Sequence, residues 1–246
     1  MCGRFVVAVP DLSGIGTRFF VKRGRIESWR PRYNVAPTQL APVITNESER
    51  RIALFSFGLI PSWAKQRSVA SKLINARSET VREKPSFRDA FVRRRCVVPV
   101  TGYYEWQKTP GSKRSTPTLV QRKDGEILPL AGVWESWVSP DGEVVESFAI
   151  LTCDAQGFVR DIHDRMPVAL RPDDVEAWLS PEARTKLGAP EADDVEPLEA
   201  RIVSSLVNSP ANDGPECIAP VSESAAATAS QASAQLALAL DVPRRR

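Results

Sequence analysis

The sequence has few of the residues on which metal, redox and disulfide chemistry usually depends. Its 246 residues include one histidine and four cysteines, which are Cys2, Cys96, Cys153 and Cys217. No two cysteines form a CxxC pair, which argues against a zinc ribbon or a thioredoxin-like motif. Their wide spacing gives no disulfide framework, and no signal peptide precedes them. The sequence therefore predicts free thiols in a reducing cytosol and a cytoplasmic location.

Long hydrophobic runs are also absent. The apolar stretch near the N-terminus is too short for a secretory signal, and Cys2 precedes it, so a lipoprotein signal is excluded as well. No run approaches the length needed to cross a membrane, and no membrane partner is expected. The formal net charge is only +3, which does not by itself indicate nucleic acid.

Basic residues are nevertheless unevenly distributed and form three clusters. These are Arg18, Lys22, Arg23, Arg25, Arg30 and Arg32; then Lys65, Arg67, Lys72, Arg77 and Arg82; then Arg93, Arg94 and Arg95. Each cluster alone is compatible with a solvated surface. If the three converged on one face of the fold, they would form a track for phosphates.

Short apolar segments broken by Pro, Gly and polar turns predict a fold rich in strands. Strands are expected over Arg51–Gly58, Arg95–Val100, Thr116–Gln121 and Glu146–Thr152. The Asp-Gly pairs within Lys123–Glu126 and Ser139–Glu143 are expected to close hairpins. Helices are expected after Asp11 and over Pro85–Arg94 and Arg171–Ser180. This mixture predicts one α+β domain over residues 1–221, built on antiparallel sheet with flanking helices.

Cys2 is the first residue with unusual chemical capacity. Initiator methionine is normally removed before a small residue, which would leave Cys2 as a terminal 1,2-aminothiol. Its amine would titrate near ~8 and its thiol near ~8.5, so both nucleophiles are partly available at neutral pH. The amine can form a Schiff base with an aldehyde, and the thiol can then close a thiazolidine ring. The alternative is an incidental residue at a frayed end.

Two further residues suit proton transfer, and two suit substrate binding. His163 is the single histidine, and imidazole titrates near neutral pH, although a lone histidine can also be structural. Glu105 lies in the aromatic stretch TGYYEW, where apolar surroundings would raise its pKa, unless it forms a salt bridge at a strand end. Asn75 and Arg77 alternate along an expected strand, where Asn can orient a polar substrate and Arg can bind phosphate.

The motifs together resemble the SRAP family, whose members shield abasic sites in single-stranded DNA. In order they are MCGRF, NVAPTQ, GLIPSW, LINARSET, RRCVVPVTGYYEW, LAGVWE and IHDRMP, and they span the chain from Met1 to about Val221. The resemblance implies a barrel-like SRAP domain that acts in DNA damage repair and the SOS response. It also implies a covalent thiazolidine link between Cys2 and the abasic sugar, which needs no metal or organic cofactor.

The same resemblance implies roles for individual residues. Asn75 would position the sugar and the terminal amine, Glu105 would transfer protons, and His163 would help to open the sugar ring. Arg4 and Arg77 would contact phosphates. The DNA would be bordered by loops that contain Asn34, Pro37 and Trp63; exposed Pro and Trp can stack on bases, although both are also common in loop packing.

Two other activities remain open from the sequence. Cys2, with His163 as base and Glu105 as the orienting group, could form a thiol autopeptidase or hydrolase whose only cut is the removal of Met1. The chain could instead bind single-stranded DNA without covalent chemistry. A lyase activity at the abasic site is a third expectation that follows from the resemblance, and DNA binding would associate the protein with the nucleoid.

The composition changes after Val221. Residues 222–235 are almost entirely Ala, Ser, Gln and Thr, which predicts a disordered tail over 222–246. The tail contains QLALAL, Gln235–Leu240, which resembles the peptides that dock on the bacterial replication sliding clamp. The alternative is an incidental Ala/Leu-rich helix.

Overall fold

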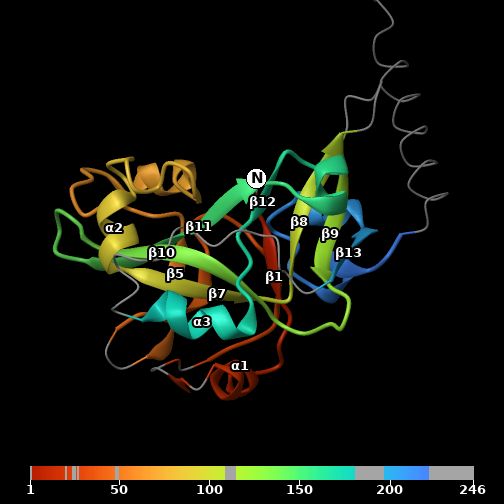
Figure 1. Cartoon of the computed structure of the whole chain (residues 1–246), viewed down its shortest axis with the longest axis horizontal. Coiled ribbons are helices and arrows are strands. Elements are labelled where there is room, and N and C mark those ends of the chain that lie inside the picture. The colour runs from red at the N-terminus through yellow and green to blue at the C-terminus, as the bar shows by residue number, and fades with distance from the viewer. Residues whose placement is uncertain are drawn as a thin grey trace, which may run out of the picture.

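The computed structural model describes residues 2–19, 21–23, 26, 28–47, 50–108, 115–180 and 197–221 (Figure 1). The expected disordered tail, 222–246, and its Gln235–Leu240 peptide lie outside the described residues. Within the described ranges the strands form two sheets, and short helices and turns flank them.

Five strands form a closed ring on one side of the molecule. They are β4 (Leu40–Thr45), β5 (Arg51–Phe57), β7 (Arg95–Val100), β10 (Leu128–Val138) and β11 (Val144–Asp154). The ring closes because β11 pairs antiparallel with β10 and parallel with β5. Three short strands extend it: β2 (Lys22–Arg23), β6 (Asn75–Arg77) and β12 (Arg165–Pro167). Every residue of β7 is buried, as expected for a strand that lies within a core.

A second sheet of five antiparallel strands packs beside the ring. Its order is β13 (Leu198–Ile202), β9 (Ser115–Arg122), β8 (Gly102–Lys108), β1 (Phe5–Val7) and β3 (Arg32–Val35). Figure 1 shows β8, β9 and β13 on one side, the ring strands on the other and β1 between them. Phe5 of β1 contacts Phe57 of β5 with ring centroids 5.1 Å apart, and Phe57 stacks on Phe148 of β11 at 5.3 Å. All three rings are fully buried, so the two sheets share one core.

Three short helices flank the sheets: α1 (Ser13–Arg18), α2 (Arg88–Arg93) and α3 (Pro172–Leu179). The 3-10 turns η1 (Arg67–Lys72), η2 (Gly157–Asp161), η4 (Ser205–Asn208) and η5 (Pro215–Ile218) complete the described elements. Buried Arg95 holds two of the helices against β7, because its guanidinium lies 4.7 Å from the ring centroid of Phe91 in α2 and 4.6 Å from the ring of Trp178 in α3. The α+β class, the barrel-like sheet and the flanking helices are thus confirmed.

One of the two expected hairpins is wrong. The turn at Ser139–Glu143 does join β10 to β11, with Val138 opposite Val144. The turn at Lys123–Glu126 joins β9, which pairs with β8 and β13, to β10, which pairs with β7 and β11. Gly125 has a φ of +73°, so the Asp-Gly pair does form a turn. Turn chemistry fixes the local bend, but burial of the following strand in the ring decides its partners.

Candidate active site at the N-terminus

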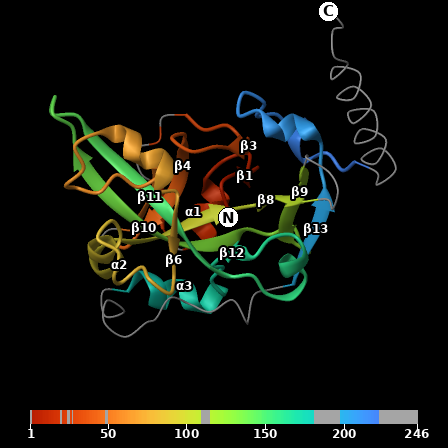
Figure 2. The same ribbon diagram turned by 90° about the horizontal axis from the view of Figure 1, so that it is seen from above.

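The start of the chain lies between the two sheets. Viewed from above, the N-terminus is flanked by β6 and β12 on one side and by β8 on the other (Figure 2). Cys2 is fully buried, and Nδ2 of Asn75 donates a hydrogen bond to its backbone oxygen at 3.0 Å. Pairing of β6 with β11 holds Asn75 in place, opposite Ile150. Oδ1 of Asn75 is buried and accepts no hydrogen bond from the described residues, which leaves an acceptor free beside Cys2.

Glu105 reaches this region from β8, the neighbour of β1 in the second sheet. The register places Phe5 opposite Tyr103, so Glu105 lies two residues further along β8, toward Cys2. Glu105 is only 2% exposed, and burial raises the pKa of its carboxyl group to about 7. A carboxyl group with this pKa is populated in both protonation states at neutral pH, so it can both accept and donate a proton.

The Cys2 thiol, unlike the Glu105 carboxyl group, is held in one protonation state. Its burial, and secondarily the charge of Glu105, raise its pKa well above the ordinary range. The thiol is therefore protonated at neutral pH and needs a base to become a nucleophile.

His163 follows η2 and precedes β12. Burial lowers the pKa of its imidazole. Nδ1 of His163 lies 2.9 Å from the backbone N–H of Arg165 and 2.6 Å from Oδ1 of Asp164. The two contacts require different protonation of Nδ1. We assign the acceptor state, because the backbone N–H is fixed by β12 whereas the Asp164 side chain is 86% exposed and can rotate away. Neutral His163 then carries its proton on Nε2.

Arg165 and Glu79 are functional candidates that the sequence reasoning missed. The Arg165 guanidinium makes two parallel hydrogen bonds with the Glu79 carboxylate, at 2.7 and 2.9 Å, and a third with the backbone oxygen of Thr152 at 2.7 Å. It also forms an ion pair with Asp154. The pair ties the turn after β6, which carries Asn75, to β12, which follows His163. Both residues lie inside family-like motifs, LINARSET and IHDRMP, but nothing in the sequence shows that they meet.

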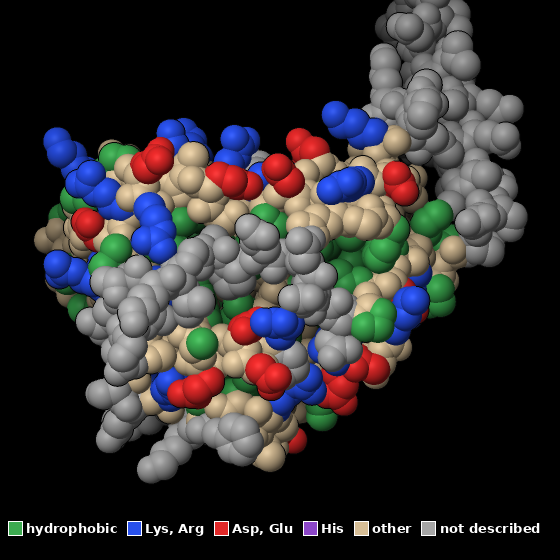
Figure 3. All heavy atoms as spheres, viewed as in Figure 1, with side chains coloured by type: hydrophobic (Ala, Val, Ile, Leu, Met, Phe, Trp, Pro, Cys, Tyr) green, Lys and Arg blue, Asp and Glu red, His purple; other side chains and the backbone are tan. Residues whose placement is uncertain are grey.

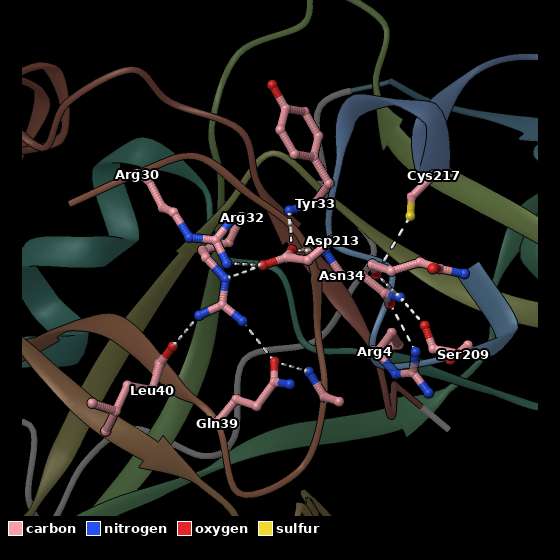
Figure 4. Close-up of polar contacts among 12 residues, drawn as sticks. Arg4, Arg30, Arg32, Tyr33, Asn34, Gln39, Leu40, Ser209, Asp213 and Cys217 are labelled. Atoms are coloured by element: carbon pink, nitrogen blue, oxygen red, sulfur yellow. Dashed lines mark hydrogen bonds and ion pairs between the residues drawn. The ribbon is translucent and has the colours of Figure 1, made fainter. Parts of the chain in front are cut away.

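Arg4 and Asn34 form one hydrogen-bonded unit (Figure 4). Nη1 of Arg4 donates to Oδ1 of Asn34 at 2.8 Å and to the backbone oxygen of Val207 at 2.9 Å. Asn34 is fully buried, and its amide nitrogen donates to three backbone oxygens. Asn34 therefore lies buried beneath Arg4, and its place in the expected DNA-binding loops stays a prediction.

The remaining expected DNA contacts lie at the surface. Trp63 is 62% exposed, in the loop after β5, and Pro37 is half-buried in the turn after β3. This loop leads through η1 to β6. Arg67 of this segment pairs with Glu143, whereas three exposed cations form no ion pair with the described residues: Lys65, Lys72 and Arg77. Figure 3 shows Lys and Arg side chains along the edge that carries η1 and the N-terminus, with acidic side chains between them.

In the other two basic clusters, most of the described side chains are paired or buried, although Arg93 is exposed. In the first, Arg18 pairs with Glu126, and both Arg30 and Arg32 pair with Asp213. In the third, Arg94 pairs with Glu135 at 2.6 Å and Arg95 is buried. The described residues of the three clusters therefore do not form one continuous phosphate track. The cluster around η1 and β6 has the most exposed cations without an ion pair among the described residues.

The described residues offer neither a metal centre nor a membrane span. Within the described ranges, no group of three or more His, Cys, Asp or Glu side chains is arranged to hold a metal ion. No helix that the structure describes is long and apolar enough to cross a membrane.

The fold and site define a two-sheet protein with a buried cysteine at position 2, beside an amide and a carboxyl group of raised pKa. Residues 1–210 match the family described as SOS response associated peptidase (SRAP), and the chain belongs to this family.

Relatives and solved structures agree with this assignment. The chain is 38% identical to abasic site processing protein YoqW of Bacillus subtilis, over 89% of this chain and 99% of the relative. It is 34% identical to abasic site processing protein HMCES of Pongo abelii, over 90% of this chain and 76% of the relative. A crystal structure of a protein from Bacteroides thetaiotaomicron is 26% identical and superposes with a TM-score of 0.76, covering 90% of this chain and 100% of that one.

Proposed function

We propose that this protein processes abasic sites in DNA: it binds the single strand and links Cys2 covalently to the exposed sugar as a thiazolidine, after loss of Met1. The observation that carries the proposal is the set of groups around Cys2. Asn75 donates a hydrogen bond to the Cys2 backbone oxygen, and the charge of Glu105 contributes to the raised pKa of the Cys2 thiol. The names of the relatives support DNA with abasic sites as the substrate.

The proposed chemistry begins with the sugar. An abasic deoxyribose exchanges between a closed hemiacetal and an open aldehyde, and the aldehyde is the strong electrophile. As the ring opens, the anomeric hydroxyl loses a proton to solvent and the ring oxygen gains one from solvent. Neutral His163 would donate a hydrogen bond from Nε2 to the ring oxygen and so stabilise it as it leaves. The lesion has no base, so no flipping energy is needed to expose the sugar.

Two bonds then form at the aldehyde carbon. The Cys2 amine attacks it, and loss of the oxygen as water gives an imine. The thiol adds to the same carbon while its proton passes to the imine nitrogen, which closes the five-membered ring. Aminothiol and aldehyde thus yield thiazolidine and one water, with no oxidant, metal or cofactor required. Glu105, with a pKa of about 7, would carry protons from the amine to the leaving oxygen, and then the thiol proton to the imine nitrogen.

The proposed DNA contacts come from two exposed residues, Arg77 and Trp63, and two half-buried ones, Arg4 and Pro37. Arg4 and Arg77 would hold the phosphates on either side of the sugar, and Trp63 and Pro37 would stack on neighbouring bases. Oriented binding turns a slow bimolecular capture into a step within the complex. Asn34 would act through Arg4 and not by touching DNA.

The test is a denaturing gel after incubation with matched abasic and intact oligonucleotides. We expect a denaturant-resistant adduct with the abasic strand alone. Cys2→Ala should lose the adduct and keep most of the affinity, because the arginines supply the binding. Cys2→Ser tests ring closure, because a hydroxyl is the weaker nucleophile. A full-strength adduct from Cys2→Ala would exclude the thiazolidine, and strand cleavage without an adduct would indicate a lyase.

A second candidate, a thiol autopeptidase, is favoured by the description of the family as a peptidase. Here Cys2, His163 and Glu105 would remove Met1. Synthesis in a translation system without methionine aminopeptidase, followed by mass spectrometry, decides the matter. Loss of Met1 from the wild type but not from Glu105→Gln would support self-cleavage, and retention of Met1 in both would exclude it.

We also propose that Gln235–Leu240 docks on the replication sliding clamp. Leu236, Leu238 and Leu240 alternate with small residues, and an Ala/Ser-rich stretch separates them from the domain. Tethering to a clamp would raise the local concentration of the protein at forks, where abasic single strands arise during DNA damage.

A further inference from the structure

The segment after β13 folds back onto β3 through one carboxylate (Figure 4). Asp213 lies just beyond the family match, which ends at residue 210. Its side chain is 10% exposed. Oδ1 accepts hydrogen bonds from the backbone N–H groups of Tyr33 and Asn34 at 2.8 and 2.9 Å. Oδ2 accepts from Nη2 of Arg30 at 3.0 Å and from Nε of Arg32.

The Asn34 side chain in turn donates hydrogen bonds to the segment that carries Asp213. Its amide nitrogen donates to the backbone oxygens of Val207, Ser209 and Asn212 at 3.2, 3.0 and 2.7 Å. Asp213 therefore holds the backbone of Asn34, and the Asn34 side chain holds the backbone of residues 207–212. We call this reciprocal set the Asp213 clasp.

Arg4 rests on the clasp. Nη1 of Arg4 donates to Oδ1 of Asn34 and to the oxygen of Val207, and both acceptors belong to it. The guanidinium also lies 5.7 Å from the ring centroid of Trp106, whose indole N–H donates to Oδ1 of Asn208 at 2.7 Å. The groups that fix the Arg4 side chain therefore come from β3, from β8 and from the segment that Asp213 ties down.

We propose that Asp213 is a positioning residue for Arg4, and that the segment 205–217 is part of the phosphate-binding side of the DNA site. The proposal rests on the proposed function. An arginine held in one rotamer loses less conformational freedom on binding phosphate than a mobile one, so a clasp that fixes Arg4 strengthens binding.

Charge alone predicts the opposite effect. Asp213 forms ion pairs with both Arg30 and Arg32, so its removal raises the local net charge by one, and a purely electrostatic role would make its loss tighten DNA binding. The sign of the effect therefore separates positioning from charge. Glu126→Ala is the matched control, because it likewise frees an arginine, Arg18, through an ion pair that does not touch Arg4.

The experiment measures affinity for intact single-stranded DNA at several salt concentrations, with the melting temperature of each variant as a check on folding. Asp213→Ala should weaken binding about threefold to tenfold and reduce the salt slope by about 1, as expected for the loss of one phosphate contact. Glu126→Ala should bind as the wild type does or slightly more tightly. If the alanine variant does not fold, Asp213→Asn decides. Its amide oxygen can still accept from β3, so positioning predicts binding like that of the wild type, and tighter binding would overturn the proposal.

The double variant identifies Arg4 as the residue through which Asp213 acts. Asp213→Ala should add nothing to the loss caused by Arg4→Ala, because the two changes remove the same contact. Additive losses, or tighter binding by Asp213→Ala, would overturn the proposal, and so would unchanged binding by Arg4→Ala. If instead the dependence on Arg4 holds but the wild type gives no adduct with an abasic strand, the covalent function alone fails.

Discussion

Replacing Glu105 with glutamine should stabilise the protein at alkaline pH and not at acidic pH. Glu105 is 2% exposed, and burial raises its pKa from 4.5 to about 7. Between these values the folded protein holds a proton that the unfolded chain releases, so the free energy of unfolding falls as pH rises through this window. Ionising Glu105 thus costs the folded state about 3 kcal/mol above pH 7, at about 1.36 kcal/mol for each pH unit.

Glutamine has nearly the same shape and no charge to bury. At pH 5 the Glu105→Gln variant and the wild type should differ little in free energy of unfolding. At pH 8 the variant should be more stable by up to about 3 kcal/mol, less whatever the ionised carboxylate gains from its partners. Urea unfolding at half-unit steps from pH 5 to 8.5 measures this difference. Glu83→Gln, at an exposed site, is the control and should show no such trend.

A difference between the two proteins that stays constant across pH would refute the assignment of a raised pKa to Glu105. The same pKa predicts the kinetics of the proposed reaction. If the ionised carboxylate is the base, the rate of adduct formation should rise with pH through about 7, and Glu105→Gln should lose that dependence along with most of the rate.

Three other outcomes are expected. Arg77→Ala should weaken binding to intact and abasic strands alike and lower the salt slope by about 1; titrations at two salt concentrations check this, and an unchanged slope would remove Arg77 from the phosphate contacts. Glu79→Gln should slow adduct formation at saturating DNA without weakening binding, and a change in affinity alone would contradict this. The hydrogen bonds from Arg165 lower the pKa of Glu79, so the variant should be destabilised at pH 7, and by less as the pH falls below the ordinary glutamate pKa and the wild type loses this contribution too. A labelled Ala232–Arg246 peptide should bind purified sliding clamp in fluorescence polarisation, and Gln235→Ala and Leu238→Ala should each weaken it; indifference to both would leave the peptide without a role.

Features of the fold that depend on a few neighbouring residues were predictable from the sequence. The continuous apolar run in β7 and the turn before β11 gave their elements directly. The partners of β10 were not predictable, because they depend on which sheet buries the residues after Gly125. The parallel contact of β11 with β5, which closes the ring, joins segments far apart in the chain and leaves no mark on either.

The candidate site likewise has residues that the sequence predicts and contacts that it does not. Cys2 and Glu105 stand out by residue type and by their neighbours, and the structure places both between the two sheets. The Arg165–Glu79 pair and the Asp213 clasp are invisible in the sequence, because each depends on a contact between distant segments. Asn34 shows the limit most clearly: its residue type suits DNA contact, but its burial beneath Arg4 makes it part of the support.

The enclosure of Cys2 has a consequence for how long the protein stays usable. Under the proposed function each molecule is consumed by one lesion, so a molecule whose sulfur has already reacted is lost. Peroxide and alkylating metabolites attack thiolates far faster than thiols, and they need access to the sulfur. A thiol that is buried and held protonated avoids both routes of damage. The protein can therefore persist between episodes of DNA damage with its sulfur intact, and react only with an aldehyde that the DNA itself carries into the site.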